Sequence, residues 1–317
     1  MPASSPLANR VLAGDPRALA RALSLVEDES PDATALLAAL YPSTGRAWTL
    51  GMTGPPGAGK STLVDQIARA LRQRGVSVGI IAVDPTSPFT GGAILGDRVR
   101  MQAHAGDAGV FIRSMATRGH LGGLAGATSD AALLLDAAGR ECVIIETVGV
   151  GQAEVDIVRA ADVCVVVLVP GTGDDVQALK AGIMEIADLF VVNKSDRDGA
   201  DRMVAAVESV LGLVTADTGT WAPPVLKTEA TRGVGVSEVL EAIHRFRAQA
   251  RSTIDRRRSE RVQYRIRELL ASAFLDRAGR RLAPGELEQL GRQVAERKVD
   301  PYSAVAGLLD KVCGAQE

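Results

Sequence analysis

Short apolar runs that alternate with stretches of helical periodicity dominate the middle of the chain. The runs are nearly continuous in apolar residues, as expected for strands whose two faces are both covered by helices. Because helical stretches separate them, we expect an α/β fold with a mostly parallel, doubly wound sheet over residues 47–247. The predicted strands are Trp48–Thr53, Val76–Val83, Val110–Arg113, Cys142–Glu146, Val163–Val169, Leu189–Val192 and Val225–Lys227.

Both ends of the chain show helical periodicity without such runs. Leu19, Leu23 and Val26 share one helical face, so residues 1–46 are predicted to form a helical extension. Residues 248–317 are either a helical cap on the same subunit or, as we expect, a dimerisation arm, because a short helical hairpin buries little core alone. Their three apolar stripes are Val262, Ile266, Leu269, Leu270 and Ala273; Leu287, Leu290 and Val294; and Val305, Leu308, Leu309 and Val312.

Composition adds limits on partner and location. The net charge of -2 argues against nucleic acid as a bulk electrostatic partner. The cysteines Cys142, Cys164 and Cys313 form neither a disulfide framework nor a paired metal-ligand motif, and they fit a reducing compartment. The apolar runs are too short to span a bilayer and no signal peptide is evident, so we expect a cytoplasmic protein without a membrane partner. The basic run Arg256-Arg257-Arg258 is expected to be a solvated helix face.

A phosphate-binding loop follows the first predicted strand. Its glycines let successive backbone N–H groups curl around a β-phosphate, and the start of the next helix adds partial positive charge. Lys60 can reach the β- and γ-phosphates, and the Ser61 hydroxyl can ligate Mg²⁺. Leu63, Ile67 and Leu71 share a helical face, which completes the strand–loop–helix context. The loop matches G-x-x-x-x-G-K-S and reads Gly54-Pro55-Pro56-Gly57-Ala58-Gly59-Lys60-Ser61-Thr62.

A second motif, Asn193-Lys194-Ser195-Asp196, directly follows the predicted strand Leu189–Val192 and matches the N-K-x-D guanine-reading motif of G proteins. The Asp196 carboxylate can accept hydrogen bonds from guanine N1–H and the exocyclic amine, whereas adenine has no N1–H donor. A site built on such a bond discriminates by roughly 10⁴ or more. Lys194 can lay its aliphatic stem along the base, and Asn193 can brace the loop. The motif therefore favours GTP and GDP over adenine nucleotides.

Acidic residues at other strand ends are candidates for a Mg²⁺ site. Glu146 takes the place of the acid in a D-x-x-G segment, in which the acid holds Mg²⁺ through water and the glycine, here Gly149, senses the γ-phosphate. A glutamate there departs from the small GTPases, and the alternative is an acid that caps the next helix. Asp84 and Asp97 are further candidates because hard cations take oxygen ligands, although Asp97 is equally well explained as a turn-capping residue.

Together these segments resemble the methylmalonyl-CoA-mutase-associated GTPases of the MeaB/ArgK type, which are chaperones of adenosylcobalamin enzymes. The resemblance covers nearly the whole chain. Its most specific segment is Glu146-Thr147-Val148-Gly149-Val150-Gly151-Gln152. The other matching segments are Gly54–Thr62, Val83–Pro88, Gly91–Arg98, Arg118–Leu124 and Asn193–Asp196.

The resemblance also implies roles for individual residues. It implies Mg²⁺ ligation by Ser61, with Asp84, Asp97 and Glu146 around the metal, and we predict Lys60 and Glu146 as the catalytic residues. It implies a third switch loop, Gly171–Lys180, that signals to the mutase, and a final guanine loop in which this chain departs from the family by having a glutamate before the alanine. The signalling residues are predicted to be Asp174, Gln177 and Lys180, and the final guanine loop to comprise Glu229, Ala230 and Thr231.

The expected function is that of a homodimeric GTP-binding and GTP-hydrolysing chaperone, which gates adenosylcobalamin loading or protection of an acyl-CoA mutase such as methylmalonyl-CoA mutase. No obvious catalytic glutamine or arginine finger presents itself, so we expect a low intrinsic rate that the partner stimulates. One alternative is a nickel-insertion GTPase, which usually carries Cys/His metal motifs; the isolated His104, His120 and His244 provide none. The other is an ATP-dependent kinase, which the guanine motif disfavours.

Overall fold

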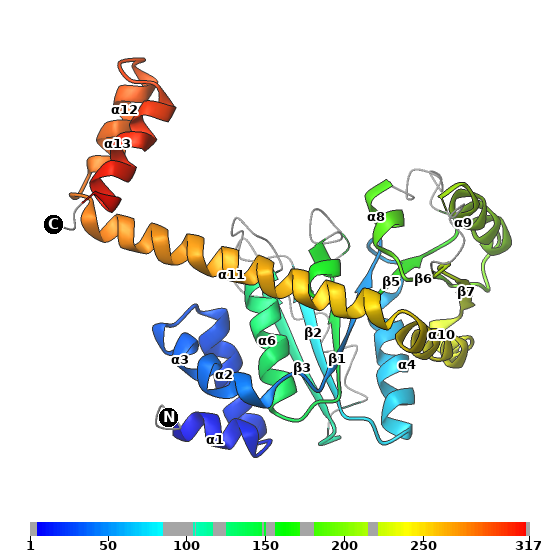
Figure 1. Cartoon of the computed structure of the whole chain (residues 1–317). Coiled ribbons are helices and arrows are strands. Elements are labelled where there is room, and N and C mark those ends of the chain that lie inside the picture. Colours follow the sequence, from blue (N-terminus) through cyan, green and yellow to red (C-terminus); the bar gives the residue numbers. More distant parts are fainter. Residues whose placement is uncertain are drawn as a thin grey trace. The chain divides into compact units, whose positions relative to one another are not determined.

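The computed structural model describes residues 5–84, 104, 106–116, 125–147, 149, 156–171, 181–214 and 221–314 (Figure 1). The chain divides into two compact units, Met1–Ser259 and Glu260–Glu317. The sequence predicts that the nucleotide-binding domain ends at residue 247 and the C-terminal arm begins at residue 248, and this domain division stays a prediction. In the described part of the chain, no helix is both long and apolar enough to cross a membrane.

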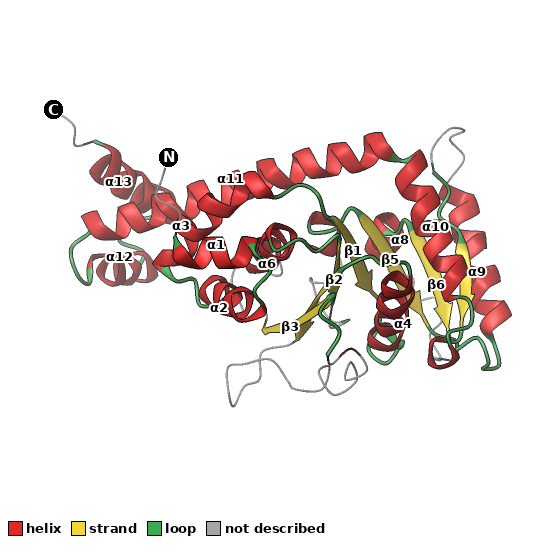
Figure 2. Cartoon of the chain, turned by 90° about the horizontal axis from the view of Figure 1, so that it is seen from below, coloured by secondary structure: helices red, strands yellow, loops and turns green. Residues whose placement is uncertain are grey.

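A seven-stranded parallel sheet forms the centre of the first unit (Figure 2), which confirms the predicted fold class. The strand order is β3-β2-β4-β1-β5-β6-β7, so β1, which leads into the phosphate loop, has three strands on each side. All seven predicted strands are present, and β3 continues three residues beyond its predicted end. The strands are β1 (Trp48–Thr53), β2 (Val78–Asp84), β3 (Val110–Ala116), β4 (Cys142–Glu146), β5 (Val163–Leu168), β6 (Leu189–Asn193) and β7 (Val225–Thr228).

Helices cover both faces of this sheet. Alternate residues of each strand point to opposite faces, and each face packs against its own helices. On one face, Leu50 of β1 and Val165 of β5 lie in one core with α4 and α10; on the other, Ile145 of β4 packs with α6 and the N-terminal helices, and Phe190 of β6 with α9. The helices of this unit are α1 (Pro6–Leu12), α2 (Pro16–Glu27), α3 (Pro31–Leu40), α4 (Lys60–Gln73), α6 (Ala125–Ala137), α8 (Ala181–Ile186), α9 (Ala200–Val214) and α10 (Val236–Gln249).

The N-terminal helical extension is joined to the edge of the sheet by polar contacts as well as by apolar packing. The Asp15 carboxylate caps the start of α2 by accepting from two backbone N–H groups. Glu27 of α2 pairs with Arg113 of the edge strand β3. Asp136 of α6 accepts from the backbone N–H groups of Gly45 at 2.6 Å and Ala47 at 3.0 Å, which fixes the connection into β1.

The first turns of α11 (Arg251–Arg281) are held at the amino-terminal ends of the central strands. Arg257 makes two hydrogen bonds to the Asp188 carboxylate, at 2.6 and 2.9 Å, and Arg258 makes two to Asp162, at 2.6 and 3.0 Å. Burial raises the pKa of Asp188 above its ordinary value, against the lowering effect of Arg257. The expectation that this basic run is a solvated helix face is therefore wrong for Arg257 and Arg258, because two buried aspartates pair with them; Arg256 is exposed.

The second unit contains the rest of α11, α12 (Glu286–Ala295) and α13 (Pro301–Cys313). The last two helices begin close to Pro284 and Pro301, as the sequence predicts. Lys311 of α13 pairs with Glu286 of α12 at 2.5 Å, and the Asp300 carboxylate caps α13. Most of the predicted apolar stripe of α11 is exposed, including Leu270 at 68% and Ile266 at 59%.

Candidate functional site

The phosphate loop lies where β1 ends and α4 begins, at the carboxyl edge of the sheet. Gly59 precedes α4 with a φ of 89°, and a β-carbon there would collide with Asn193 Nδ2, so this position requires glycine. Lys60 is buried, and its ammonium group donates to the carbonyl oxygens of Gly54 at 2.8 Å and Pro55 at 3.0 Å. The cation is thereby held inside the loop, next to the backbone N–H groups that would receive a phosphate.

Two of the residues predicted to hold Mg²⁺ meet beside this loop. The Ser61 hydroxyl donates to Glu146 Oε1 at 2.6 Å, and both side chains are buried. Gly149 lies against the phosphate loop with a φ of 87°, so close that a β-carbon would collide with the Gly54 carbonyl and approach Lys60 Nζ. The segment after β4 therefore contacts the residues predicted to bind the phosphates and the metal.

The guanine motif is tied directly to the phosphate loop. Asn193, the last residue of β6, donates from Nδ2 to the Ala58 carbonyl at 2.8 Å, and Lys194 donates from Nζ to the Gly57 carbonyl at 2.7 Å. Lys194 has a φ of 56°, which turns the chain sharply at the end of the strand. The next acid in the motif, Asp196, is exposed. The first two residues of the guanine motif, Asn193 and Lys194, thus support the phosphate loop, and the Asp196 carboxylate stays accessible to a base.

The final guanine loop follows β7, the neighbour of β6. Asn193 Oδ1 accepts from the Thr228 hydroxyl at 3.0 Å and from the Ala230 backbone N–H at 3.1 Å. Glu229 pairs with Arg232 at 3.1 Å, so the glutamate that departs from the family pattern is neutralised within its own turn. Thr231 is exposed at the same turn. The predicted residues of this loop thus lie beside the guanine motif.

Not every predicted site residue can be placed. Asp84 is the last residue of β2, which is two strands away from β1, and it pairs in register with Ala116 of β3. Four others lie outside the described residues: Asp97 of the metal set, and Asp174, Gln177 and Lys180 of the signalling loop. The segment that contains Asp97 follows Asp84 at the carboxyl end of β2, and the signalling loop begins at Gly171, after β5. Both strands end at the same edge of the sheet as the phosphate loop.

Three threonines at this edge were not among the predicted site residues. Thr53 and Thr147 are hydrogen-bonded through their hydroxyls at 3.0 Å, and Thr228 holds Asn193. All three are buried. Their only signal in the sequence is a polar residue at the carboxyl end of an apolar run, which is also how many ordinary strands end.

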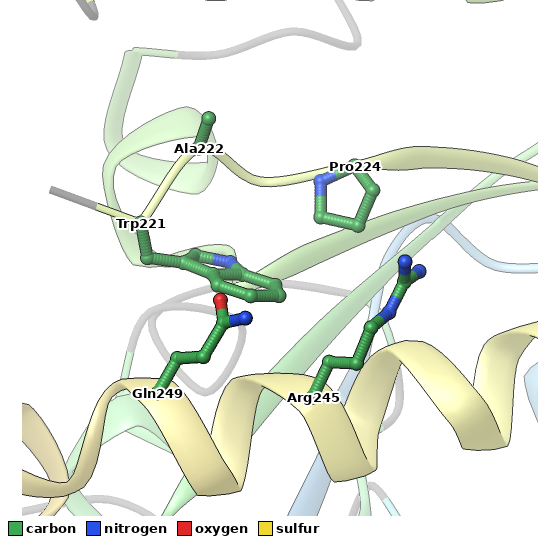
Figure 3. A pocket seen from close by; sticks show the side chains of 5 residues that line it. All are labelled: Trp221, Ala222, Pro224, Arg245 and Gln249. Atoms are coloured by element: carbon green, nitrogen blue, oxygen red, sulfur yellow. The ribbon is translucent and has the colours of Figure 1, made fainter.

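A shallow pocket of about 320 Å³ lies at the opposite edge of the sheet (Figure 3). Trp221 and Pro224, just before β7, face Arg245 and Gln249 from the end of α10. The indole N–H donates to the Asp188 carbonyl at 2.8 Å, and its ring meets Phe246 edge-on. The indole is therefore part of the packing of α10 on the sheet, and the pocket is distinct from the nucleotide loops.

Comparisons with known proteins agree with this geometry. The family described as methylmalonyl Co-A mutase-associated GTPase MeaB matches residues 19–283. A Pyrococcus abyssi protein described as a GTPase is 48% identical over 313 residues, which are 97% of this chain and 96% of that protein. A mitochondrial Mus musculus protein, described as a methylmalonic aciduria type A homolog, is 36% identical over 220 residues. The match covers 68% of this chain and 53% of that protein.

Among solved structures, that of an LAO/AO transport system kinase superposes with a TM-score of 0.70 at 28% identity, and the match covers 96% of this chain and 95% of that one. The resemblance seen in the sequence is thereby confirmed. A family match over most of the chain, together with a relative nearly half identical along its length, shows that the chain belongs to the methylmalonyl Co-A mutase-associated GTPase family MeaB.

Proposed function

We propose that this GTPase is a chaperone of an adenosylcobalamin-dependent acyl-CoA mutase, such as methylmalonyl-CoA mutase, and that its nucleotide state gates loading or protection of the mutase cofactor. The family description names this mutase, and the mouse relative is named after methylmalonic aciduria. The observation that carries the nucleotide part is that Lys60, Glu146 and Asn193 come together at the phosphate loop, each hydrogen-bonded to a residue of that loop.

The nucleotide is GTP or GDP in this proposal. Backbone N–H groups of Gly54–Thr62 and the Lys60 ammonium would hold the phosphates, and Gly149 would lie against the γ-phosphate. Asp196 would accept from guanine, Lys194 would cover the base, and the loop at Ala230 would close over it. The braces from Asn193 and Lys194 to the phosphate loop favour this assignment, because they join the base-reading and phosphate-binding parts in advance of the ligand.

Mg²⁺ fits the oxygens present beside the phosphate loop. Ser61 Oγ and Glu146 Oε1 are adjacent hard donors, which is the chemistry that Mg²⁺ prefers. Ser61 and Glu146 would hold the ion together with phosphate oxygens, with Asp84 and Asp97 as further candidates around it. A bound Mg²⁺ would neutralise the charge that develops on the β- and γ-phosphate oxygens during hydrolysis. The longer glutamate is suited to this place, because it already reaches the Ser61 hydroxyl.

The carboxyl end of β5 is the proposed route to the mutase. β5 ends beside the phosphate loop, and the predicted signalling loop Gly171–Lys180 follows it. A loop in that position that differs between GTP and GDP would bind the mutase differently in each state. By linkage, a mutase that prefers one state must change the nucleotide affinity in return. Asp174, Gln177 and Lys180 are the proposed contacts.

The test is GTP turnover with and without the cognate mutase, with ATP as the comparison nucleotide. We expect slow GTP hydrolysis alone, a severalfold higher rate with mutase, and no comparable ATP hydrolysis. Lys180→Ala should retain basal turnover and lose most of the stimulation, whereas the exposed Lys298→Ala, on the second unit, should respond like the wild type. Equal turnover of ATP would point to the kinase activity in the name of the solved relative. A mutase that leaves GTP turnover unchanged would contradict the chaperone proposal.

The exposed apolar side of α11 favours a homodimer as the oligomeric state. Val262, Ile266, Leu269 and Leu270 recur at i, i+4, i+7 and i+8, and each is about half exposed or more. A run of large exposed apolar side chains on one helix face marks a protein contact in a soluble protein. We propose that a second copy of the chain covers this face.

A further inference from the structure

Two buried threonine hydroxyls connect the strand that enters the phosphate loop with the strand that carries Glu146. Thr53 ends β1 and is 0% exposed; Thr147 directly follows β4 and is 1% exposed. The Thr147 hydroxyl donates to the Thr53 hydroxyl at 3.0 Å. If this bond were broken, the buried hydroxyls could not turn to bulk water instead, so folding of the site favours the bond.

The position of this pair relates it to the metal and phosphate groups. β1 and β4 are neighbours, with Met52 opposite Glu146, and the Thr147 N–H donates to the Met52 carbonyl at 3.0 Å. Thr53 and Thr147 thus lie side by side, one residue beyond the last paired residues Met52 and Glu146. Gly54 directly follows Thr53, and its carbonyl accepts a hydrogen bond from the Lys60 ammonium. Glu146 directly precedes Thr147, and its carboxylate accepts one from the Ser61 hydroxyl.

Beyond the last paired residues of β1 and β4 no further backbone pairing holds the two segments together. The side-chain bond between Thr147 and Thr53 lies at this point. Here the phosphate loop turns away after Thr53, while the segment from Thr147 leads to Gly149, which packs against that loop. Mg²⁺ demands near-ideal octahedral geometry with short bonds of about 2.0–2.1 Å, so small shifts between Glu146 and Ser61 weaken its binding. Groups that orient metal ligands from behind commonly change metal affinity by about 10- to 100-fold when they are removed.

We propose that Thr147 is a positioning residue for GTP hydrolysis: through its bond to Thr53 it holds Glu146 and Gly149 at the distance from the phosphate loop that Mg²⁺ binding requires. This role rests on the proposed Mg²⁺ site. The threonines lie at the ends of β1 and β4, whereas the predicted base-binding residues follow β6 and β7, so we expect the effect on the metal and not on the choice of nucleotide.

The experiment is a Mg²⁺ titration of GTP hydrolysis at saturating GTP, in the full-length chain. Thr147→Val keeps the branched shape and removes the donor. We expect its half-saturating Mg²⁺ concentration to rise about tenfold, at the low end of the range for such groups, while GDP affinity in excess chelator stays within about twofold of the wild type. Thr147→Ser restores the hydroxyl and should bring the Mg²⁺ requirement back towards the wild-type value.

Thr49→Val is the matched control. Thr49 lies on the same strand, β1, at its opposite end, and its hydroxyl accepts from the Asp162 N–H at 2.8 Å. This variant should lose thermal stability without changing its Mg²⁺ requirement. If Thr147→Val titrates like the wild type, or shifts no more than Thr49→Val, the positioning role is refuted.

The second half of the pair gives an independent check. Thr53→Val should shift the Mg²⁺ requirement as Thr147→Val does, and the double variant should shift it no further than the larger single effect, because one bond is lost in all three. Shifts that multiply in the double variant would contradict a shared bond. Hydrolysis by the wild type that does not depend on Mg²⁺ would instead refute the metal site itself, an outcome visible without any variant.

Discussion

Asn193 shows how much of the nucleotide site depends on one side chain. Its amide donates to the phosphate loop at Ala58 and accepts from Thr228 and Ala230 of the final guanine loop. Three segments far apart in the sequence are therefore joined by an asparagine that is itself almost fully buried. Aspartate at this position would keep the acceptor and lose the donor, so the residue type follows from the bonds it makes.

His244 gives a prediction about pH at the same scale. Partial burial lowers the pKa of its imidazole below the ordinary value, and the charges of Arg247 and Arg74 lower it further. The unfolded chain takes up this proton near the ordinary pKa of about 6.5, so it binds more protons than the folded chain between the lowered pKa and that value. The free energy of unfolding should therefore fall as the pH drops through this window.

His244→Gln should remove this contribution. Urea midpoints of the wild type and the variant, measured near pH 7.5 and near pH 5.5, would show a smaller loss on acidification for the variant. The other titratable groups are present in both proteins, so the comparison isolates His244. An equal or larger loss in the variant would show that the His244 pKa is not lowered by folding.

Among the elements, the first turns of α11 depend on partners that belong to distant strands. Arg257 and Arg258 are consecutive residues of one helix, yet each faces an aspartate at the start of a different strand. Asp162 also accepts from the Thr49 N–H of β1, and Asp188 from the Cys164 N–H of β5. The two pairs thus link the helix with the amino-terminal ends of three adjacent strands.

Removing one member of such a pair should be costly. Arg257→Met leaves Asp188 buried without its charged partner, so we expect about 3–5 kcal/mol lower free energy of unfolding at neutral pH. The exposed Arg256→Met on the same helix should cost no more than about 0.5 kcal/mol. Adding Asp188→Asn to Arg257→Met should recover part of the loss, because the buried charge is gone. Denaturant unfolding of these variants and of Asp188→Asn alone completes the comparison, and additive losses in the double variant would contradict a direct pairing.

How far the sequence predicts these elements depends on whether the signal is local. The central strands are recognisable because both faces are buried, and α12 and α13 because prolines open them. β3 extends beyond its predicted end because it is an edge strand, in which Arg113 and Ser114 are tolerated. α1 has seven residues, too few for a periodic stripe of its own, so it was predicted only as part of the helical extension over residues 1–46.

The candidate site divides in the same way. The phosphate loop and guanine motif are contiguous and could be found by pattern. The Thr147–Thr53 bond spans 94 positions and the Arg258–Asp162 pair spans 96, so neither can be found without the strand order. For the same reason the basic run at Arg256–Arg258 was expected to be solvated.

For the whole molecule, the proposed second copy of the chain leads to a prediction about mass in solution. Leu270 lies in the exposed apolar stripe of α11, and Ala271, one residue on and also exposed, lies about 100° further round the helix. Leu270→Asp should convert a dimer into a monomer, because it places a charge in the apolar face. Ala271→Asp introduces the same charge and should remain a dimer.

Light scattering over a range of concentrations gives the mass directly. GTP turnover should persist in both variants, since neither residue belongs to the nucleotide loops. A wild-type protein that is monomeric at every concentration, or a dimeric Leu270→Asp variant, would place the apolar face of α11 outside any self-association.

The place of β1 in the sheet bears on how a newly made chain acquires its site. Of the seven strands of the sheet, β1 leaves the ribosome first, but it stands fourth in the sheet and its flanking strands are β4 and β5. A nascent chain that has emerged only as far as α4 carries the complete phosphate loop on an apolar strand with no neighbour to pair with. GTP cannot assist folding at that stage, because Glu146 and Asn193 have not been synthesised. Until Leu168 has emerged, the edges of β1 lack one or both of their partner strands and are open to wrong pairing.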